Sequence, residues 1–269
     1  DFLDEIDRQA LGLKVDALKF YTGLPERDGE FPWTMDDEAL VYPFYERCRQ
    51  HDIRTICVHK GLPLPGSDIQ YTHPRDMKKA SLDNPDLNFV VYHSGFKAAN
   101  YELPPGDGFI GENGYLAWTT DLVRDREENP GMSNVYMELG TTFGHTAITH
   151  PRICGHLLGQ VIRAFGADHV IFGTDSIWWG SPQWQIEAFR RFQIPQNLQD
   201  EFGYEPITDE QKEMMLGLNA APLFNIDVDA VHSRFPDDGL SKLKAQYRDE
   251  GGQPSNSQYG WVYEPGLRA

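Results

Sequence analysis

Hydrophobic positions in this chain gather into short continuous runs instead of alternating with polar ones. Four runs end in a polar residue beside a glycine or a turn: ICVHKG at 56–61, FVVYHSG at 89–95, VYMELG at 135–140 and VIFGTDS at 170–176. A fifth run, VDALKFY, occupies 15–21. Continuous apolar runs are typical of parallel strands covered on both faces. The pattern therefore predicts a parallel β-sheet.

Helix-like segments separate these runs, which favours an α/β architecture. We expect helices near 36–51, 74–83, 112–128, 151–166, 181–193 and 208–218. Thr34 and Thr208 are the expected caps of the first and the last. Eight strand–helix units of a (β/α)8 barrel need about 250 residues, and five units already fill this chain. We therefore predict a partial TIM-barrel-like domain over residues 1–227 and a polar C-terminal tail over 228–269 that packs on it.

Polar residues stand at the C-terminal strand ends, where parallel barrels carry their chemistry. His59, His93, Glu138 and Asp175 occupy these positions. Neighbouring parallel strands lie about 5 Å apart, so both imidazoles can face one pocket and bind a metal. Asp175 closes an apolar strand and needs a partner there, either a metal or hydrogen-bond donors. The alternatives are a core histidine bonded to a carbonyl and an aspartate that caps the next helix.

Further candidates for substrate contact surround these four. Lys19 ends the first run, where it could bridge metals after carboxylation, pair with a carboxylate or orient an anion. Glu138 has a structural alternative, pairing with Lys19 or Arg54. Trp178 and Trp179 follow Asp175 and are expected to form an apolar pocket wall for a planar substrate. His145, His150 and His73 lie in loops that would rim the active face.

Composition narrows the function classes. The formal charge of −17 argues against a nucleic-acid partner, and no apolar run approaches the roughly 20 residues that span a membrane. The three cysteines form neither a disulfide framework nor a thiolate zinc motif. There is no GxSxG, GxGxxG or phosphate loop. A small-molecule substrate is the expected partner.

Several of these segments together resemble one family. RTICVHKG, NFVVYHSG, NVYMELG, HVIFGTDS and GLNAAPLFNID are similar to the amidohydrolase-related metal-dependent hydrolases, in the branch with aminocarboxymuconate-semialdehyde decarboxylase and γ-resorcylate decarboxylase. The resemblance implies that this chain supplies barrel strands 4–8. It implies that His59 and Asp175 are the fifth- and eighth-strand metal ligands, and that His93 ligates a second metal or polarises substrate and water. Lys19 falls on the fourth strand, and in this branch that lysine is usually not carboxylated.

The chain departs from that family at the first strand. Family members carry His-x-His or Glu-x-His there, and none of the nine histidines here forms such a pair. A preceding segment, another chain or an incomplete site would explain this, and we favour the first. We expect a homo-oligomer, or association with the segment that bears the missing strands. The implied cofactor is a divalent metal, zinc or alternatively manganese.

Three functions remain open from the sequence. The first is hydrolysis of a small amide, lactone or ester-like bond by a metal-activated water, with Asp175 as the proton acceptor. The second is non-oxidative decarboxylation of an aromatic or unsaturated carboxylic acid, which uses the same ligands. The third is a non-catalytic barrel fragment or subunit. Metal content and carbon dioxide release distinguish them.

Overall fold

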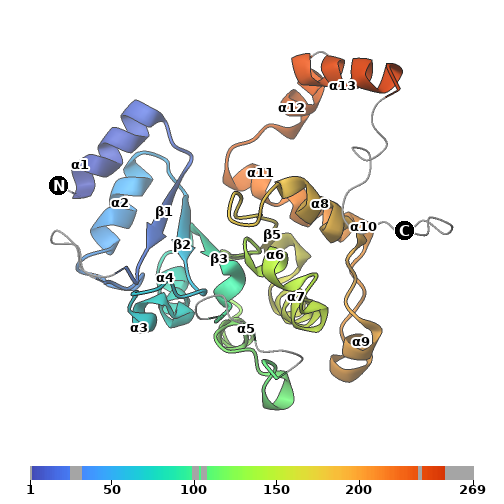
Figure 1. Ribbon diagram of the computed structural model, residues 1–269. Coiled ribbons are helices and arrows are strands. Elements are labelled where there is room, and N and C mark those ends of the chain that lie inside the picture. Colours follow the sequence, from blue (N-terminus) through green and yellow to red (C-terminus); the bar gives the residue numbers. More distant parts are fainter. Residues whose placement is uncertain (1, 25–31, 99–102, 104–107, 236–237, 252–269) are drawn as a thin grey trace.

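A five-stranded parallel sheet forms the centre of the molecule (Figure 1). The computed structural model describes residues 2–24, 32–98, 103, 108–235 and 238–251. The strands follow one another in chain order across the sheet: β1 Ala17–Tyr21, β2 Thr55–His59, β3 Asn88–Tyr92, β4 Val135–Glu138 and β5 Val170–Ile171. All four pairings are parallel. The five predicted strands and the α/β class are confirmed, although β5 ends four residues before Asp175.

The two faces of the sheet pack against hydrophobic clusters of different size. One face joins the buried side chains of the helices in a large apolar core that includes Leu18, Ile56 and Phe89. The other carries a small cluster of Cys57, Val90, Ile171 and Leu223. This division explains why the strand runs are apolar at nearly every position. Polar groups therefore concentrate on the second face and at the strand ends.

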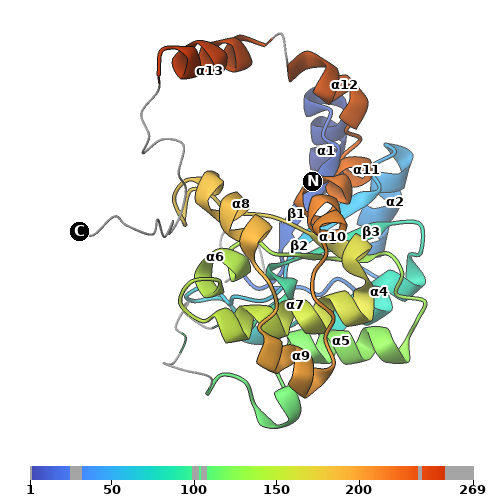
Figure 2. The same ribbon diagram turned by 90° about the vertical axis from the view of Figure 1, so that its right-hand side faces the viewer.

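Helices connect successive strands and cover the large core. Figure 2 shows α4, α5 and α7 running along one side of the sheet. The helices of the described residues are α1 Phe2–Asp7, α2 Tyr42–Gln50, α3 Ile69–Thr72, α4 Met77–Asp83, α5 Thr119–Glu128, α6 Thr142–Thr146, α7 Pro151–Phe165, α8 Pro182–Arg191, α9 Gln196–Phe202, α10 Asp209–Glu213, α11 Ala220–Leu223, α12 Val228–Arg234 and α13 Gly239–Asp249.

Two helix starts differ from the sequence prediction. Thr34 does not cap a helix, because α2 begins only at Tyr42 with a proline in its first turn. Proline is accepted there because it has no N–H to donate, whereas further inside a helix it would break the bonding. The helix expected from 112 begins at Thr119. At the last predicted helix, Thr208 accepts a hydrogen bond from the Gln211 N–H, as the capping pattern indicated.

The tail is more regular than its polar sequence suggested. Helices α12 and α13 stand apart from the sheet (Figures 1 and 2) and bury none of their residues. Residues 252–269 lie outside the described part. The packing of 228–269 on the domain thus stays a prediction. Throughout the described residues, every helix is too short or too polar to traverse a bilayer.

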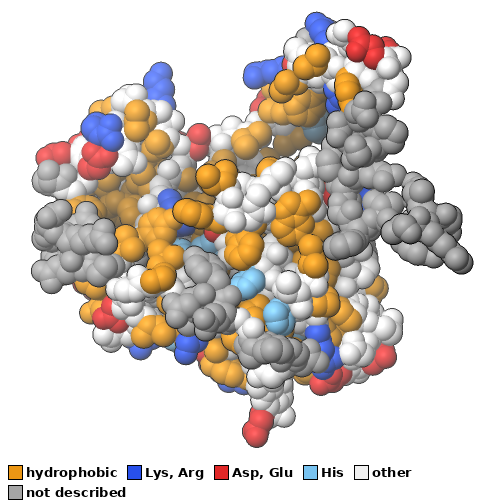
Figure 3. Space-filling model, viewed as in Figure 1, with side chains coloured by type: hydrophobic (Ala, Val, Ile, Leu, Met, Phe, Trp, Pro, Cys, Tyr) orange, Lys and Arg blue, Asp and Glu red, His pale blue; other side chains and the backbone are white. Residues whose placement is uncertain are grey.

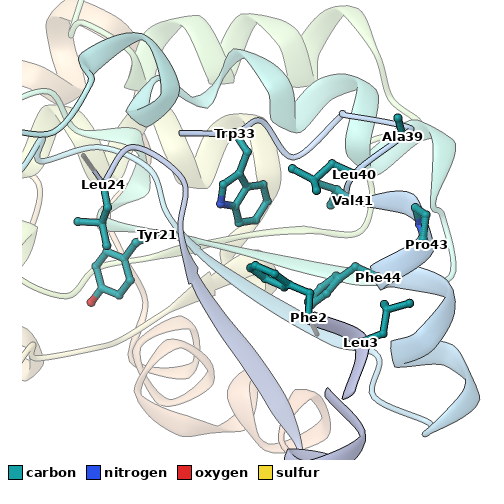
Figure 4. Close-up of a pocket in the computed structure, with 10 residues that line it drawn as sticks. All are labelled: Phe2, Leu3, Tyr21, Leu24, Trp33, Ala39, Leu40, Val41, Pro43 and Phe44. Carbon is teal, nitrogen blue, oxygen red and sulfur yellow. The ribbon is translucent and has the colours of Figure 1, made fainter. Parts of the chain in front are cut away.

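An apolar pocket of about 470 Å³ adjoins the free edge of β1 (Figure 4). No strand of the described residues pairs with that edge of β1. The pocket lies between α1, β1 and α2, and its lining is almost wholly hydrophobic: Phe2, Leu3, Tyr21, Leu24, Trp33, Ala39, Leu40, Val41, Pro43 and Phe44.

Candidate metal centre

Strand register gathers the predicted site at one end of the sheet. Tyr21, His59 and Tyr92 are direct neighbours across β1, β2 and β3. His93 and Glu138 follow at the ends of β3 and β4. Because all strands run the same way, their C-terminal residues meet at this edge. Histidine side chains are visible among hydrophobic ones near the middle of the view in Figure 3, whereas His59 and His93 are only 7% and 4% exposed.

The rings of His59 and His93 pack edge to face, with one nitrogen of each ring in contact. His93 Nε2 lies 3.0 Å from His59 Nδ1. The outer nitrogen of each ring meets a backbone carbonyl, His59 Nε2 at 3.0 Å from Leu62 O and His93 Nδ1 at 2.7 Å from Gly140 O. A carbonyl oxygen only accepts, so both outer nitrogens must donate. In neutral rings, the two inner nitrogens are then both unprotonated and present lone pairs to each other.

Burial keeps both rings neutral. It lowers the pKa of His59 to about 3, with the neighbouring His93 adding to the effect, and it lowers the pKa of His93 to about 4. Facing lone pairs repel, so this arrangement calls for a cation between them. Nitrogens that share a metal at 2.0–2.1 Å lie roughly 3.0–3.4 Å apart, and metal-bound histidines commonly donate their other N–H to a carbonyl. The pair fits a metal ion.

Glu138 is held by backbone donors. Its carboxylate accepts hydrogen bonds from the N–H of His93 at 3.2 Å and of Gly140 at 2.7 Å. Arg54, one of its two expected partners, pairs with Asp52 and Asp86 instead. Burial raises the pKa of Glu138 to about 7, against the opposing effect of these N–H groups and Lys19. A protonated fraction is therefore present at neutral pH.

Asp175, Glu138 and His93 line one cavity of about 270 Å³. Tyr92 and residues 173–176 complete its lining. The Thr141 hydroxyl donates to Asp175 Oδ2. Asp175 is also near enough to His59 for its charge to raise the pKa of that ring. As arranged, though, no three His, Cys, Asp or Glu side chains of the described residues gather closely enough to hold one metal ion.

Lys19 lies on the same face of the sheet as these groups. Its ammonium sits 3.4 Å from the centre of the Tyr92 ring and 4.8 Å from that of Tyr21. Burial lowers its pKa to about 8, although Glu138 and Asp175 act in the opposite direction. Lys19 is therefore a cation held by aromatic faces, close enough to Glu138 and Asp175 for their charges to act on it.

The two tryptophans that follow Asp175 differ in burial. Trp178 is 79% exposed, so it forms no wall of the described cavity. Trp179 is partly buried; its indole N–H donates to Thr141 at 2.9 Å, and its ring stacks on His145 at 5.1 Å. His73 accepts the Arg75 N–H at 3.0 Å. The substrate-binding roles of these residues stay predictions.

Sequence reasoning missed the residues that support the site. Thr141 is fully buried and contacts Asp175 and Trp179. Gly173 packs directly against the Glu138 carboxylate, where a Cβ would collide. A single threonine after a strand matches no sequence motif, so nothing in the sequence pointed to Thr141. The glycine directly before a strand-end Thr-Asp could have signalled a close approach.

Backbone strain occurs in the segments that follow β2, β3, β4 and β5. His93, Ser94, Thr141 and Asp175 have φ values of 66°, 51°, 58° and 49°. Leu62, which accepts from His59, has φ 36°. Left-handed backbone is unfavourable for side-chain-bearing residues and tends to cluster at functional sites. The catalytic and metal-binding roles that the sequence assigned to these positions stay predictions.

Comparison with known proteins identifies the family. The sequence profile described as amidohydrolase matches residues 1–226. The chain belongs to the amidohydrolase family. This confirms the resemblance seen in the strand-end segments. No protein of curated function matches the chain.

Solved structures with similar folds include TIM-barrel proteins. An uncharacterised TIM-barrel protein from Bordetella bronchiseptica shares 21% identity and a TM-score of 0.51, over 81% of this amidohydrolase chain and 60% of its own. A dihydroxybenzoic acid decarboxylase from Polaromonas sp. JS666, with bound manganese and the inhibitor 2-nitroresorcinol, shares 15% identity and a TM-score of 0.51, over 83% and 64%.

A third similar structure is also a manganese complex. The 5-carboxyvanillate decarboxylase from Novosphingobium aromaticivorans, with 4-hydroxy-3-methoxy-5-nitrobenzoic acid, shares 13% identity and a TM-score of 0.50, over 84% of this chain and 60% of its own. At these identities the likeness concerns the fold alone. The amidohydrolase chain spans less than two thirds of the length of each of these structures.

Proposed function

We propose that this chain forms part of a divalent-metal-dependent decarboxylase that acts without an oxidant on an aromatic or unsaturated carboxylic acid. The observation that carries the proposal is the histidine pair, whose unprotonated nitrogens face each other at 3.0 Å with both outer nitrogens bonded to carbonyls. His59 and His93 are the proposed metal ligands. Asp175, on the adjacent cavity wall, is the proposed third.

The remaining ligands would come from the rest of a barrel. We propose that β1 to β5 correspond to strands 4–8 of a TIM barrel. The free edge of β1 and the apolar pocket beside it supply a backbone ladder and a hydrophobic surface for a further strand–helix unit. In such a barrel the first strand pairs with the eighth, so the segment with the first-strand ligands would close on the β5 edge, beside Asp175. Association with it, or between copies of this chain, is therefore part of the proposal.

Substrate recognition is assigned to Lys19 and the aromatic rings near it. The substrate carboxylate would pair with the Lys19 ammonium, which lies over Tyr92 and Tyr21. A bound divalent cation would polarise a substrate oxygen and favour charge development on the ring or double bond. Loss of carbon dioxide leaves the carbon needing one proton. Glu138 and Asp175 line the same cavity, and Glu138, with its pKa of about 7, can carry that proton.

Hydrolysis is the second candidate, favoured by membership of the amidohydrolase family. It would use the same histidines, with Asp175 accepting a proton from water. Decarboxylation receives more support because two proteins of similar fold are decarboxylases of hydroxylated or methoxylated benzoic acids. Manganese is bound in both, so it joins zinc as the metal to test.

One experiment separates these functions. The chain, expressed in manganese- or zinc-supplemented medium, is assayed for metal content and for carbon dioxide release from hydroxybenzoic acids. We expect bound metal and carbon dioxide, with His59→Ala losing both. Amide or ester cleavage without carbon dioxide would favour hydrolysis. A metal content below about 0.2 per chain would remove the catalytic proposal for the chain alone, because metal affinity is coupled to folding.

A further inference from the structure

The turn after β4 contacts both sides of the candidate centre. Gly140 O accepts from His93 Nδ1, and the next residue, Thr141, donates its hydroxyl hydrogen to Asp175 Oδ2. Trp179 donates its indole N–H to the same hydroxyl at 2.9 Å. The indole N–H is only a donor, so the single hydroxyl hydrogen of Thr141 must point to the carboxylate. The hydrogen bonds therefore run in one direction, from Trp179 to Thr141 and from Thr141 to Asp175.

We propose that Thr141 is a positioning residue that selects which oxygen of Asp175 is free to bind metal. This inference rests on the proposed metal function. Oδ2 is occupied by the threonine hydroxyl, whereas no hydrogen bond to Oδ1 occurs in the described part of the chain. Oδ1 is thus left to act as a single-oxygen ligand. Trp179 supports the hydroxyl from the far side, so the loop 176–180 is coupled to the centre.

Burial and backbone conformation support a dedicated role. Thr141 is fully buried, and its φ of 58° is unusual for a β-branched residue. His145 stacks on the Trp179 ring at 5.1 Å and holds the indole in place. The hydrogen bonds to Asp175 and from Trp179 explain why a hydroxyl occupies this strained and buried position. The same arrangement makes Trp179 a natural optical and magnetic reporter of the state of Asp175.

Substitutions can isolate the hydroxyl. Thr141→Val keeps the β-branched shape, and thus the backbone strain, while it removes only the hydroxyl. Thr141→Ser keeps the hydroxyl and should rescue. Thr149→Val is the matched control, because Thr149, in the exposed segment between α6 and α7, donates its hydroxyl hydrogen to the carbonyl of His145. Manganese binding is measured by electron paramagnetic resonance, and thermal unfolding shows that each variant is folded.

Thr141→Val should weaken manganese binding about 10- to 100-fold, the usual effect of losing an outer partner of a ligand. Thr141→Ser and Thr149→Val should stay within about threefold of the unmodified chain. Equal affinity in the valine variant would overturn the positioning role while leaving the metal proposal intact. Failure of the unmodified chain to bind manganese would instead count against the metal proposal.

A second measurement needs no metal. The indole N–H signals are recorded by ¹⁵N-edited NMR, and the Trp179 signal is assigned as the one lost in Trp179→Phe. Both Thr141→Val and Asp175→Asn should shift that signal, because the chain of hydrogen bonds links all three side chains. An unmoved signal in Asp175→Asn would refute the chain Asp175–Thr141–Trp179 directly.

Discussion

His59 and His93 show how two common side chains acquire a specific chemistry. Each ring is neutral because it is buried, and each tautomer is set by a backbone carbonyl. Neither carbonyl is visible as a motif. The sequence predicted the pocket shared by the rings because the strand ends are in register. It did not predict which nitrogen of each ring would face the other.

Acid should destabilise the metal-free chain through this pair. The pKa values of His59 and His93 are depressed in the folded state, so the unfolded chain binds more protons below pH 6.5. The stability they contribute is complete above pH 6.5 and lost as the pH falls toward 4 and 3. The loss should amount to a few kcal/mol, on the order expected for such buried groups.

Urea unfolding between pH 3 and 7.5 in the presence of a chelator measures this effect. His59→Gln should flatten the decline, because the glutamine does not titrate. An identical pH dependence in that variant would show that other groups dominate. His232→Gln, on the exposed helix α12, is the control.

Gly173 sets the position of the Glu138 carboxylate. A Cβ at residue 173 would collide with the carboxylate of Glu138. We expect Gly173→Ala to destabilise the chain by about 1–3 kcal/mol, as other overpacking substitutions do. Gly217→Ala, where a Cβ meets open space and the backbone likewise has no positive φ, is the control. Equal urea midpoints for the two variants would contradict the packing argument.

At the level of elements, a buried ion pair attaches the loop after β2 to the core. Lys60, fully buried, donates to Asp76 at 2.6 Å and to Tyr71 O at 2.7 Å. Asp76 also accepts the Met35 N–H at 2.8 Å. Lys60 directly follows His59. The pair therefore holds the segment that contains Leu62, the acceptor for the His59 ring.

Breaking the Lys60–Asp76 pair should strongly lower the free energy of unfolding. Asp76→Asn leaves the Lys60 charge buried without its counter-ion, and we expect a loss of about 3–5 kcal/mol in the free energy of unfolding. Asp125→Asn removes the partly exposed partner of Lys78 and should lose less than about 1 kcal/mol. Urea denaturation of both variants compares them. Similar losses would show that burial of the pair has little effect.

The elements also show where sequence reading stops. Apolar runs located all five strands, because the sheet is largely covered: β2 is buried at every position, although in β1 only Leu18 is fully buried. The predicted start of α2 was wrong. Acidic residues at 36–38 are typical of the N-terminal turn of a helix. In the structure the Asp37 carboxylate instead accepts hydrogen bonds from the N–H groups of Ala39 and Leu40 in a turn. Thr141 escaped notice because its partners come from other loops. Local pattern predicts elements, and tertiary contacts decide their junctions.

For the whole molecule, the free edge of β1 and its apolar pocket predict association. Leu40, 42% exposed, lines that pocket. If a second copy or a complementary barrel segment covers the pocket, Leu40→Asp should weaken association at least tenfold, as expected when a charge replaces a buried apolar contact. Leu82→Asp, at 39% exposed on α4, is the matched control.

Sedimentation velocity over a range of concentrations measures this association. The unmodified chain should sediment faster as its concentration rises, and Leu82→Asp should behave in the same way. A chain that stays monomeric throughout, or a Leu40→Asp variant that associates normally, would argue against the pocket as a contact surface.

The left-handed strand ends have a consequence for the evolution and engineering of this molecule. Each such residue costs roughly 1–2 kcal/mol relative to ordinary backbone, so His93, Ser94, Thr141 and Asp175 together lower the stability by several kcal/mol. Glycine at Ser94 or Thr141 would recover part of it. Selection for thermal stability alone would thus favour replacement of the residues that shape the cavity. The more stable variants would then lose the proposed metal binding and catalysis.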